Sequence, residues 1–509
     1  FFAGTEINST DRSKNYYQGW GMQYSMGEIP YYVYEFFKKG IEDGNNYYSL
    51  SQTRSRSAAF FANATYSYKG RYTVNGTARY EGTNRMGKSR SARWLPTWNV
   101  SGAWNAHEEK FFSNLTSVLS HFTLKASYSL TADRGPADVT NSQAIITSYS
   151  PYRPFTSIQE SGLYIKELEN SELTYEKKHE LNIGADMGFL NNRINLAVDW
   201  YKRNNYDLIG IVNTQGAGGQ ILKYANIASM KSHGIEFTLS TKNIKTKDFN
   251  WNTDFIFSNA KNEVTDLKQN ANVMELISGN GFAKQGYPVR GLFSIPFVGL
   301  DKDGIPVIIN EKGEATSTDI NFQERQNTGF LKYEGPTDPT ITGSLGNMFS
   351  YKGFRLNLFI TYSFGNVIRL NPVFKAYYSD LTAMTREFKN RWTLPGDEAK
   401  TNVPAILSKR MYDSNEDLKY AYNAYNYSTE RIAKGDFIRL KEISLAYDFP
   451  KAWINPLKLT DLSLKVQATN LFLIYADDKL NGQDPEFFNA GGVASPVPRQ
   501  FTITLRLGL

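Results

Sequence analysis

The chain has 509 residues and no cysteine, which together exclude disulfides, zinc fingers and thiol catalysis. Its net charge of +7 comes from scattered basic residues that form no block interleaved with aromatic residues, so nucleic-acid binding is not expected. No run approaches the ~18 apolar residues of a membrane-spanning helix. An aromatic share of 14% in a chain only 41% hydrophobic instead favours β-strands.

Apolar and polar residues alternate in segments along the whole chain, and this period of two predicts β-strands. We expect about 14 strands, many of them near the ~9–11 residues that a membrane-spanning strand needs. The expected strands are 1–7, 62–68, 72–80, 94–104, 122–130, 181–189, 194–201, 235–240, 251–257, 337–350, 354–364, 433–448, 462–469 and 501–509.

The last expected strand shows the alternation most clearly. One face carries Phe501, Ile503, Leu505, Leu507 and Leu509, and the other carries Thr502, Thr504, Arg506 and Gly508. An antiparallel sandwich would pack the apolar face on a core. A transmembrane barrel would turn it toward lipid. One strand does not distinguish the two folds.

The connections between the strands favour the barrel. Short turns at 69–71, 190–193, 245–248 and 351–353 alternate with long polar segments. The long connections are expected at about 8–56, 134–174, 205–229, 261–336, 367–432 and 475–498. Short turns on one side and long loops on the other are typical of outer-membrane barrels, whereas a sandwich or propeller predicts even loop lengths. The predicted fold class is an all-β transmembrane antiparallel β-barrel.

Several motifs also resemble a known family. They are Gly435–Tyr447, Ala468–Phe472, Asp484-Pro485-Glu486 and Pro496–Phe501, with Ser232–Glu236 and Phe189–Arg193 further upstream. In combination they resemble the late barrel strands of SusC/RagA-type TonB-dependent transporters of Bacteroidetes. Leu509 departs from the aromatic residue with which many outer-membrane barrels end.

This resemblance implies a barrel of about 22 strands, a count associated with a plugged lumen. Residues 1–509 then form its C-terminal part, and the chain opens within a strand, so we expect the plug, the early strands and any targeting signal to lie elsewhere. That missing part should be present in the working protein, because an open sheet edge in lipid leaves backbone groups unpaired.

The resemblance further implies energised import across the outer membrane, driven by TonB, with a SusD-like lipoprotein covering the mouth and transporters working in pairs. Oligosaccharides and oligopeptides both fit as cargo. A passive porin-like channel is the main alternative. A surface adhesin or barrel-anchored enzyme is a further one, but it needs an extracellular domain with its own core, which loops broken by Gly, Asn and Pro do not predict.

Loop aromatics are the candidate substrate-binding residues, because aromatic rings stack on sugars and on peptide side chains alike. The candidates are Tyr149, Tyr152, Phe155, Phe374, Tyr377, Tyr378, Tyr425, Phe487 and Phe488. The alternative for each is that it packs loops together. The lumen-facing residues Arg355, Lys465 and Arg506 are expected to pair with acids of the lumen or the plug.

Other motifs have simpler interpretations. Asp301-Lys302-Asp303-Gly304 is expected to form a hairpin turn, because the glutamate that would complete a calcium loop is missing. Gly216–Gly219 is expected at a loop tip. The four histidines, His107, His121, His179 and His233, have no ligand spacing. We expect no metal, no cofactor and no catalytic site.

Overall fold

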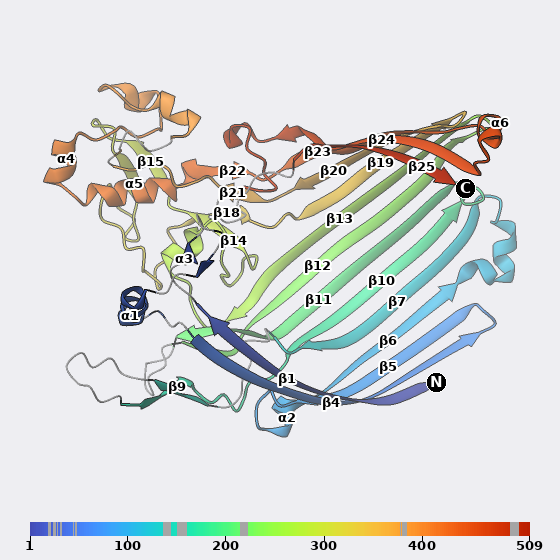
Figure 1. Cartoon of the computed structure of the whole chain (residues 1–509), viewed down its shortest axis with the longest axis horizontal. Helices are drawn as coiled ribbons and strands as arrows, with labels where there is room; N and C mark the ends of the chain where they lie inside the picture. Colours follow the sequence, from blue (N-terminus) through green and yellow to red (C-terminus); the bar gives the residue numbers. More distant parts are fainter. Residues whose placement is uncertain are drawn as a thin grey trace.

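The computed structural model describes residues 1–18, 22–23, 27, 29–30, 33–43, 45, 48–135, 144–149, 160–213, 222–376, 378, 384–488 and 498–508. Its main element is a 14-stranded antiparallel sheet that runs from β1 at one edge to β25 at the other (Figure 1). The strands in order are β1 (Phe2–Tyr17), β4 (Tyr48–Tyr68), β5 (Tyr72–Thr83), β6 (Trp94–Asn105), β7 (Leu119–Asp133), β10 (Glu176–Phe189), β11 (Ile194–Asn213), β12 (Leu222–Lys245), β13 (Phe249–Leu267), β19 (Ile341–Tyr351), β20 (Phe354–Phe364), β23 (Phe437–Asp448), β24 (Asp461–Ala476) and β25 (Gln500–Gly508).

The sheet confirms the expected strands, but several continue further toward the long connections. β1 and β4 stay paired as far as Tyr17 and Tyr48, and β11 and β12 as far as Asn213 and Leu222. The expected loops 8–56 and 205–229 were therefore too long. The extension of β1 and β4 is polar on both faces, so it carries no alternation that a sequence reading can detect.

The four tight turns, after β4, β10, β12 and β19, lie at one end of the sheet together with the connections after β6 and β23, and the longest connections lie at the other end, as Figure 1 shows. The tightest are the hairpins at Lys69-Gly70 and Lys352-Gly353, where both central residues have positive φ (52° and 70°, 44° and 93°). Two such residues define the type I′ turn, whose twist matches that of paired strands. The segment after β6 contains the 3-10 helices η2 (Ala106–Glu108) and η3 (Lys110–Asn114), and the segment after β23 contains α6 (Lys451–Ile454) and η7 (Asn455–Leu457).

The two faces of the sheet differ in character. On β25, Phe501 and Ile503 are each 74% exposed, and their apolar face continues onto Leu464 and Val466 of β24. The polar residues between them belong to the opposite, inward face. No helix in the described ranges is long and apolar enough to cross a membrane.

The long connections form small elements of their own. Nearest the N-terminus are β2 (Met22–Gln23), β3 (Ile29–Pro30), α1 (Tyr34–Glu42), α2 (Arg90–Arg93) and the hairpin of β8 (Ile145–Tyr149) and β9 (Gly162–Glu167). Between β13 and β19 lie α3 (Val273–Ile277), β14 (Gly291–Ser294), β15 (Phe297–Leu300), β16 (Pro306–Ile309), β17 (Ala315–Thr316) and β18 (Lys332–Pro336). Beyond β20 lie β21 (Val367–Arg369), η4 (Arg386–Asn390), η5 (Asp397–Ala399), α4 (Lys409–Ser414), α5 (Leu418–Asn426), η6 (Thr429–Arg431) and β22 (Ile432–Lys434), and η8 (Asp478–Leu480) follows β24.

Residues 268–340, 365–436 and 477–488 pack into one folded unit, called the loop layer here. One hydrophobic cluster joins α3 and Phe293 to Ala424 of α5, and a second joins Ile305 to Phe374 and Tyr425. Each cluster therefore draws residues from both of the longest connections. The expectation that these loops lack a core is wrong, because the core forms between loops and no single loop contains it.

Candidate functional site: the polar inner wall and the loop layer

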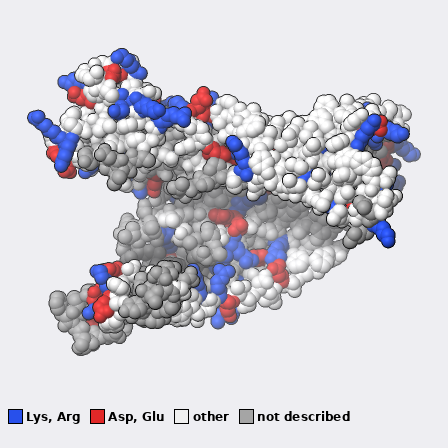
Figure 2. Space-filling view, turned by 45° about the horizontal axis from the view of Figure 1, so that its top comes forward, with Lys and Arg blue, Asp and Glu red and all other residues white. Residues whose placement is uncertain are grey.

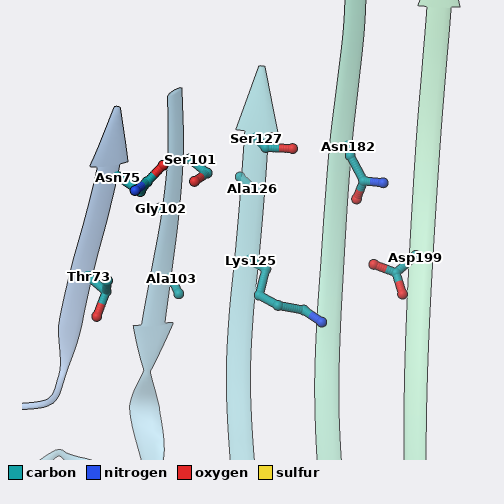
Figure 3. Close-up of a pocket in the computed structure, with 10 residues that line it drawn as sticks. All are labelled: Thr73, Asn75, Ser101, Gly102, Ala103, Lys125, Ala126, Ser127, Asn182 and Asp199. Atoms are coloured by element: carbon teal, nitrogen blue, oxygen red, sulfur yellow. The ribbon is translucent and has the colours of Figure 1, made fainter. Parts of the chain in front are cut away.

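The inward face of the sheet forms a polar wall. A hollow of about 310 Å³ lies in it, where β5, β6, β7, β10 and β11 run side by side (Figure 3). Its lining residues are Thr73, Asn75, Ser101, Gly102, Ala103, Lys125, Ala126, Ser127, Asn182 and Asp199. Lys125 pairs with Asp186 at 2.8 Å, and the Asn75 amide donates to Thr65 Oγ1 at 2.6 Å. Such a surface suits water, a polar solute or a polar protein segment.

A network of alternating charges continues the wall toward the long connections. Arg79 bonds Glu6 at 2.9 Å and Glu81 at 2.6 Å, and Arg134 Nε donates to Glu81 at 2.8 Å. A second hollow of about 360 Å³ adjoins this network, with the buried Tyr175 at its edge. Because the network links β1, β5 and the end of β7, it ties together strands that are not neighbours.

The expected pairing of lumen-facing cations is confirmed for Arg355 and Lys465. Arg355 bonds Asp448 at 2.8 Å, and Lys465 lies 3.8 Å from Glu442. Both acids belong to β23, so these pairs brace adjacent strands across the wall. Arg506 is exposed and has no ion pair within the described residues, so a partner from the plug stays a prediction for it.

Tyrosines of α5 hold the loop layer together. Tyr422 is buried, and its hydroxyl donates to the carbonyl of Ala405 at 2.6 Å. Burial raises the pKa of Tyr422 and of Tyr425 well above the ordinary value, because the ionised phenolate would lose its hydration. Both residues therefore act as neutral packing groups with satisfied polar ends.

The candidate aromatics divide between exposed and packed positions. Phe374 and Tyr425 are only 1% and 2% exposed, with ring centroids 5.2 Å apart, so they form the core of the loop layer. Tyr378 lies nearby, 5.4 Å from the ring of Phe388. Tyr149 is exposed in the β8–β9 hairpin and packs against Tyr164.

The remaining candidates lie apart from that group. Phe487 and Phe488 are half-buried in the segment after β24, where Phe488 packs on a cluster containing Ile368 and Leu480. Tyr152, Phe155 and Tyr377 lie outside the described residues, as does Gly216–Gly219. The structure thus brings Phe374, Tyr378 and Tyr425 together and leaves the others separate. Cargo contact stays a prediction.

Sequence reasoning did not single out three buried arginines that join the loops. Arg369 donates to the carbonyls of Ser428 at 2.7 Å and Phe293 at 2.6 Å, and burial lowers its pKa to about 9. Arg431 pairs with Glu387, and Arg439 holds Asp484 at 2.5 Å. Asp484 belongs to the Asp484-Pro485-Glu486 motif noted in the sequence, and that motif was the one sequence signal that could have pointed to this contact. The Arg369 bond to Phe293 joins residues 365–436 to residues 268–340, and the Arg439 pair ties residues 477–488 to β23.

The smaller motifs behave as follows. Asp301 accepts hydrogen bonds from the backbone of Asp303 and Ile305 at 2.9 Å, and Gly304 has a φ of +73°, which confirms the hairpin turn between β15 and β16. His107 and His121 are distant in sequence, yet their rings lie 4.2 Å apart. No group of three or more potential metal ligands occurs in the part of the chain that the structure describes.

A curved antiparallel sheet with an apolar outer face, a polar inner wall and loops at one end defines an outer-membrane β-barrel chain. The profile of the family "TonB dependent receptor-like, beta-barrel" matches residues 2–471. The chain belongs to this family, which is one of receptors and transporters and not of enzymes.

Relatives and solved structures agree with this assignment. The chain is 26% identical to the TonB-dependent receptor SusC of Bacteroides thetaiotaomicron over 93% of its own length and 47% of that protein. It is 25% identical to the TonB-dependent receptor P3 of Formosa agariphila, covering 84% and 41%. The RagAB peptide importer in its open-open state superposes with a TM-score of 0.75 and 22% identity over 100% of this chain and 52% of that one. The chain spans about half the length of the curated relatives it matches.

Proposed function

We propose that this chain is the C-terminal part of the barrel of a TonB-dependent importer, which takes up oligosaccharides or oligopeptides across the outer membrane. The observation that carries the proposal is the polar inner wall beneath a folded loop layer, in a chain of this family. The hollows of about 310 and 360 Å³ in the wall offer hydrogen-bonding groups to a polar cargo or to a plug segment.

The proposed partners are those that the resemblance to SusC/RagA-type transporters implies. A SusD-like surface lipoprotein covers the loop layer, TonB acts through an N-terminal plug, and an early-barrel segment of the same protein continues the sheet beyond β1 in the lipid of the outer membrane. Two such transporters work as a pair. The proposed cargo contacts among the described residues are the exposed or half-buried loop aromatics Tyr149, Tyr378, Phe487 and Phe488.

The test is purification of the native complex, with identification of every co-purifying chain by mass spectrometry and uptake assays in cells with and without TonB. A plug-bearing segment, a SusD-like lipoprotein and TonB-dependent uptake are expected. A passive porin-like channel is the alternative function, and it predicts uptake that persists without TonB and a chain that purifies closed and alone.

A surface-binding module is the second candidate, and the core of the loop layer favours it. Such a module predicts cargo binding at the cell surface without any uptake. The polar inner wall argues against it, because a barrel that serves only as an anchor has no need of hollows in its lumen. Measuring cell-associated and internalised cargo separately distinguishes the two.

A further inference from the structure

Basic residues collect on the side of the sheet that carries the four tight turns and the connections after β6 and β23. In those segments they outnumber acidic ones: the basic residues are Lys69, Arg71, Lys110, Arg193, Lys247, Lys352, Lys451 and Lys458, and the acidic ones are Glu108, Glu109 and Asp248. Taken together, the connections at the other end mix both signs, although the β5–β6 connection carries Arg85, Lys88, Arg90 and Arg93 and no acidic residue. Figure 2 shows blue side chains gathered at the end of the molecule farthest from the loop layer.

Several of these cations lack an acidic partner. Arg71 pairs with Glu109 at 3.2 Å, and Lys451 pairs with Asp461 at 3.2 Å. Others are exposed and form no ion pair among the described residues; they are Lys69, Lys110, Lys247, Lys352 and Lys458. We call these five lysines the basic rim. Their charges are available to an anionic partner outside the chain.

Ring contacts show on which side of the wall two lysines of the rim lie. The Lys69 ammonium lies 5.2 Å from the centroid of the Tyr68 ring, and the Lys352 ammonium lies 5.4 Å from that of Tyr351. Both tyrosines are exposed and share the face of the outward apolar side chains. The ammonium groups therefore lie on the outer surface of the barrel and not in its lumen.

Apolar side chains of the same connections are exposed beside the rim. Phe111 is 58% exposed and Trp453 63%, and Leu115 and Val118 are exposed as well. Aromatic rings next to lysines are the arrangement that places rings at the boundary of the hydrocarbon and ammonium groups among the lipid headgroups. A small soluble anion would leave these apolar groups in water.

We propose that the basic rim binds the phosphate groups of anionic phospholipids in the periplasmic leaflet of the outer membrane. The short turns of an outer-membrane barrel face that leaflet. Lysine serves as a compact point charge for phosphate. Near an anionic membrane surface each lysine contributes about a fivefold gain in affinity. The rim would thus fix how deeply the barrel sits in the membrane, and it would recruit a shell of anionic lipid around the barrel.

Backbone geometry supplies a clean test. Lys69, Lys352 and Lys458 have positive φ of 52°, 44° and 58°, a conformation that asparagine adopts more readily than lysine. The triple substitution Lys69→Asn, Lys352→Asn and Lys458→Asn therefore removes three charges while favouring the native turns. The matched control removes three exposed lysines of the loop layer by Lys302→Asn, Lys389→Gln and Lys419→Gln, and Lys419 also lies over a tyrosine ring.

The experiment is native mass spectrometry of the purified full complex in detergent, titrated with phosphatidylglycerol or phosphatidylcholine. The native complex and the control should prefer phosphatidylglycerol, and the rim variant should bind it with an affinity lower by about a hundredfold. Equal thermal midpoints in phosphatidylcholine would show that the variant is folded. A native complex without preference for phosphatidylglycerol, or a rim variant that binds it as the native complex does, would overturn the proposal.

Discussion

The sheet and the loop layer bury opposite kinds of residues. On β25 the apolar Phe501 is 74% exposed, whereas Phe374 of the loop layer is 1% exposed within an aromatic core. The sheet carries its polar residues on the inside, and the loop layer carries its charged residues mostly at the surface. One chain is thus built for two solvents: lipid takes the place of a core for the sheet, while the loop layer folds as a water-soluble domain does.

The largest loss of stability is expected from Phe374→Ala in the loop layer. The substitution leaves a cavity among Tyr425, Phe388 and their neighbours, and such changes in a buried core cost about 3–5 kcal/mol. Hydrogen exchange of the purified complex should show the free energy of opening of the loop layer falling by that amount, while exchange in the sheet stays unchanged.

Tyr149→Ala is the matched control, because Tyr149 is exposed in a separate hairpin. It should leave the stability of the loop layer unaltered. If Phe374→Ala abolished cargo binding without loosening the loop layer, Phe374 would contact cargo directly and its assignment to the core would be wrong.

The difference between the sheet and the loop layer explains which parts of the fold could be predicted from the sequence. The sheet was predictable because each spanning strand meets lipid on one face and the lumen on the other, which imposes a period of two on residues such as Leu464, Lys465 and Val466. The outer parts of β1 and β4 were missed because mainly polar residues occupy both of their faces there, which leaves no period of two.

The loop layer was not predictable, because its contacts join residues far apart in the chain. Ile305 packs with Phe374 and Tyr425, and Arg369 reaches the carbonyl of Phe293. No local pattern marks these pairs. The candidate aromatics were recognised as loop residues, but composition does not separate Phe374 in the core from Tyr149 at the surface.

The second prediction contrasts the two faces of β24. Val466→Arg places a charge on the lipid face and should destabilise the barrel by about 3 kcal/mol. Gln467→Arg, on the adjacent inward position, should change the stability little. Unfolding in urea after reconstitution into liposomes measures both. Equal costs would mean that this strand does not separate lipid from an aqueous lumen.

A smaller loss of stability, confined to residues 477–488, is expected from Asp484→Asn. It replaces the carboxylate that Arg439 holds at 2.5 Å with a neutral amide, while Glu486 remains 3.3 Å from Arg439. Loss of a hydrogen bond between charged groups costs about 2 kcal/mol. Residues 477–488 should exchange their amide hydrogens faster, and residues 268–340 should not.

Asp448→Asn is the control for that change, because it breaks the exposed pair with Arg355 on the inner wall. Exposed pairs contribute at most about 1 kcal/mol. If Asp448→Asn lowered the stability as much as Asp484→Asn, burial of the Arg439–Asp484 pair would add nothing to the strength of that pair.

The smallest expected effect concerns acid and the turn at 393–401. Hydrogen bonds from the backbone of Leu394 and the hydroxyl of Thr393, with the Lys400 ammonium, lower the pKa of Asp397 to about 2 from an ordinary value of 3.8. A lowered pKa stabilises the turn above pH 3.8 and stops doing so as the pH falls through about 2. Protection of amides 393–401, corrected for intrinsic exchange rates, should therefore decline between these values.

Asp397→Asn should abolish that decline. Asp413→Asn in α4 should preserve it, because the carboxyl of Asp413 accepts no hydrogen bond within the described residues. A decline that survives Asp397→Asn would place the acid-sensitive group elsewhere in the loop layer.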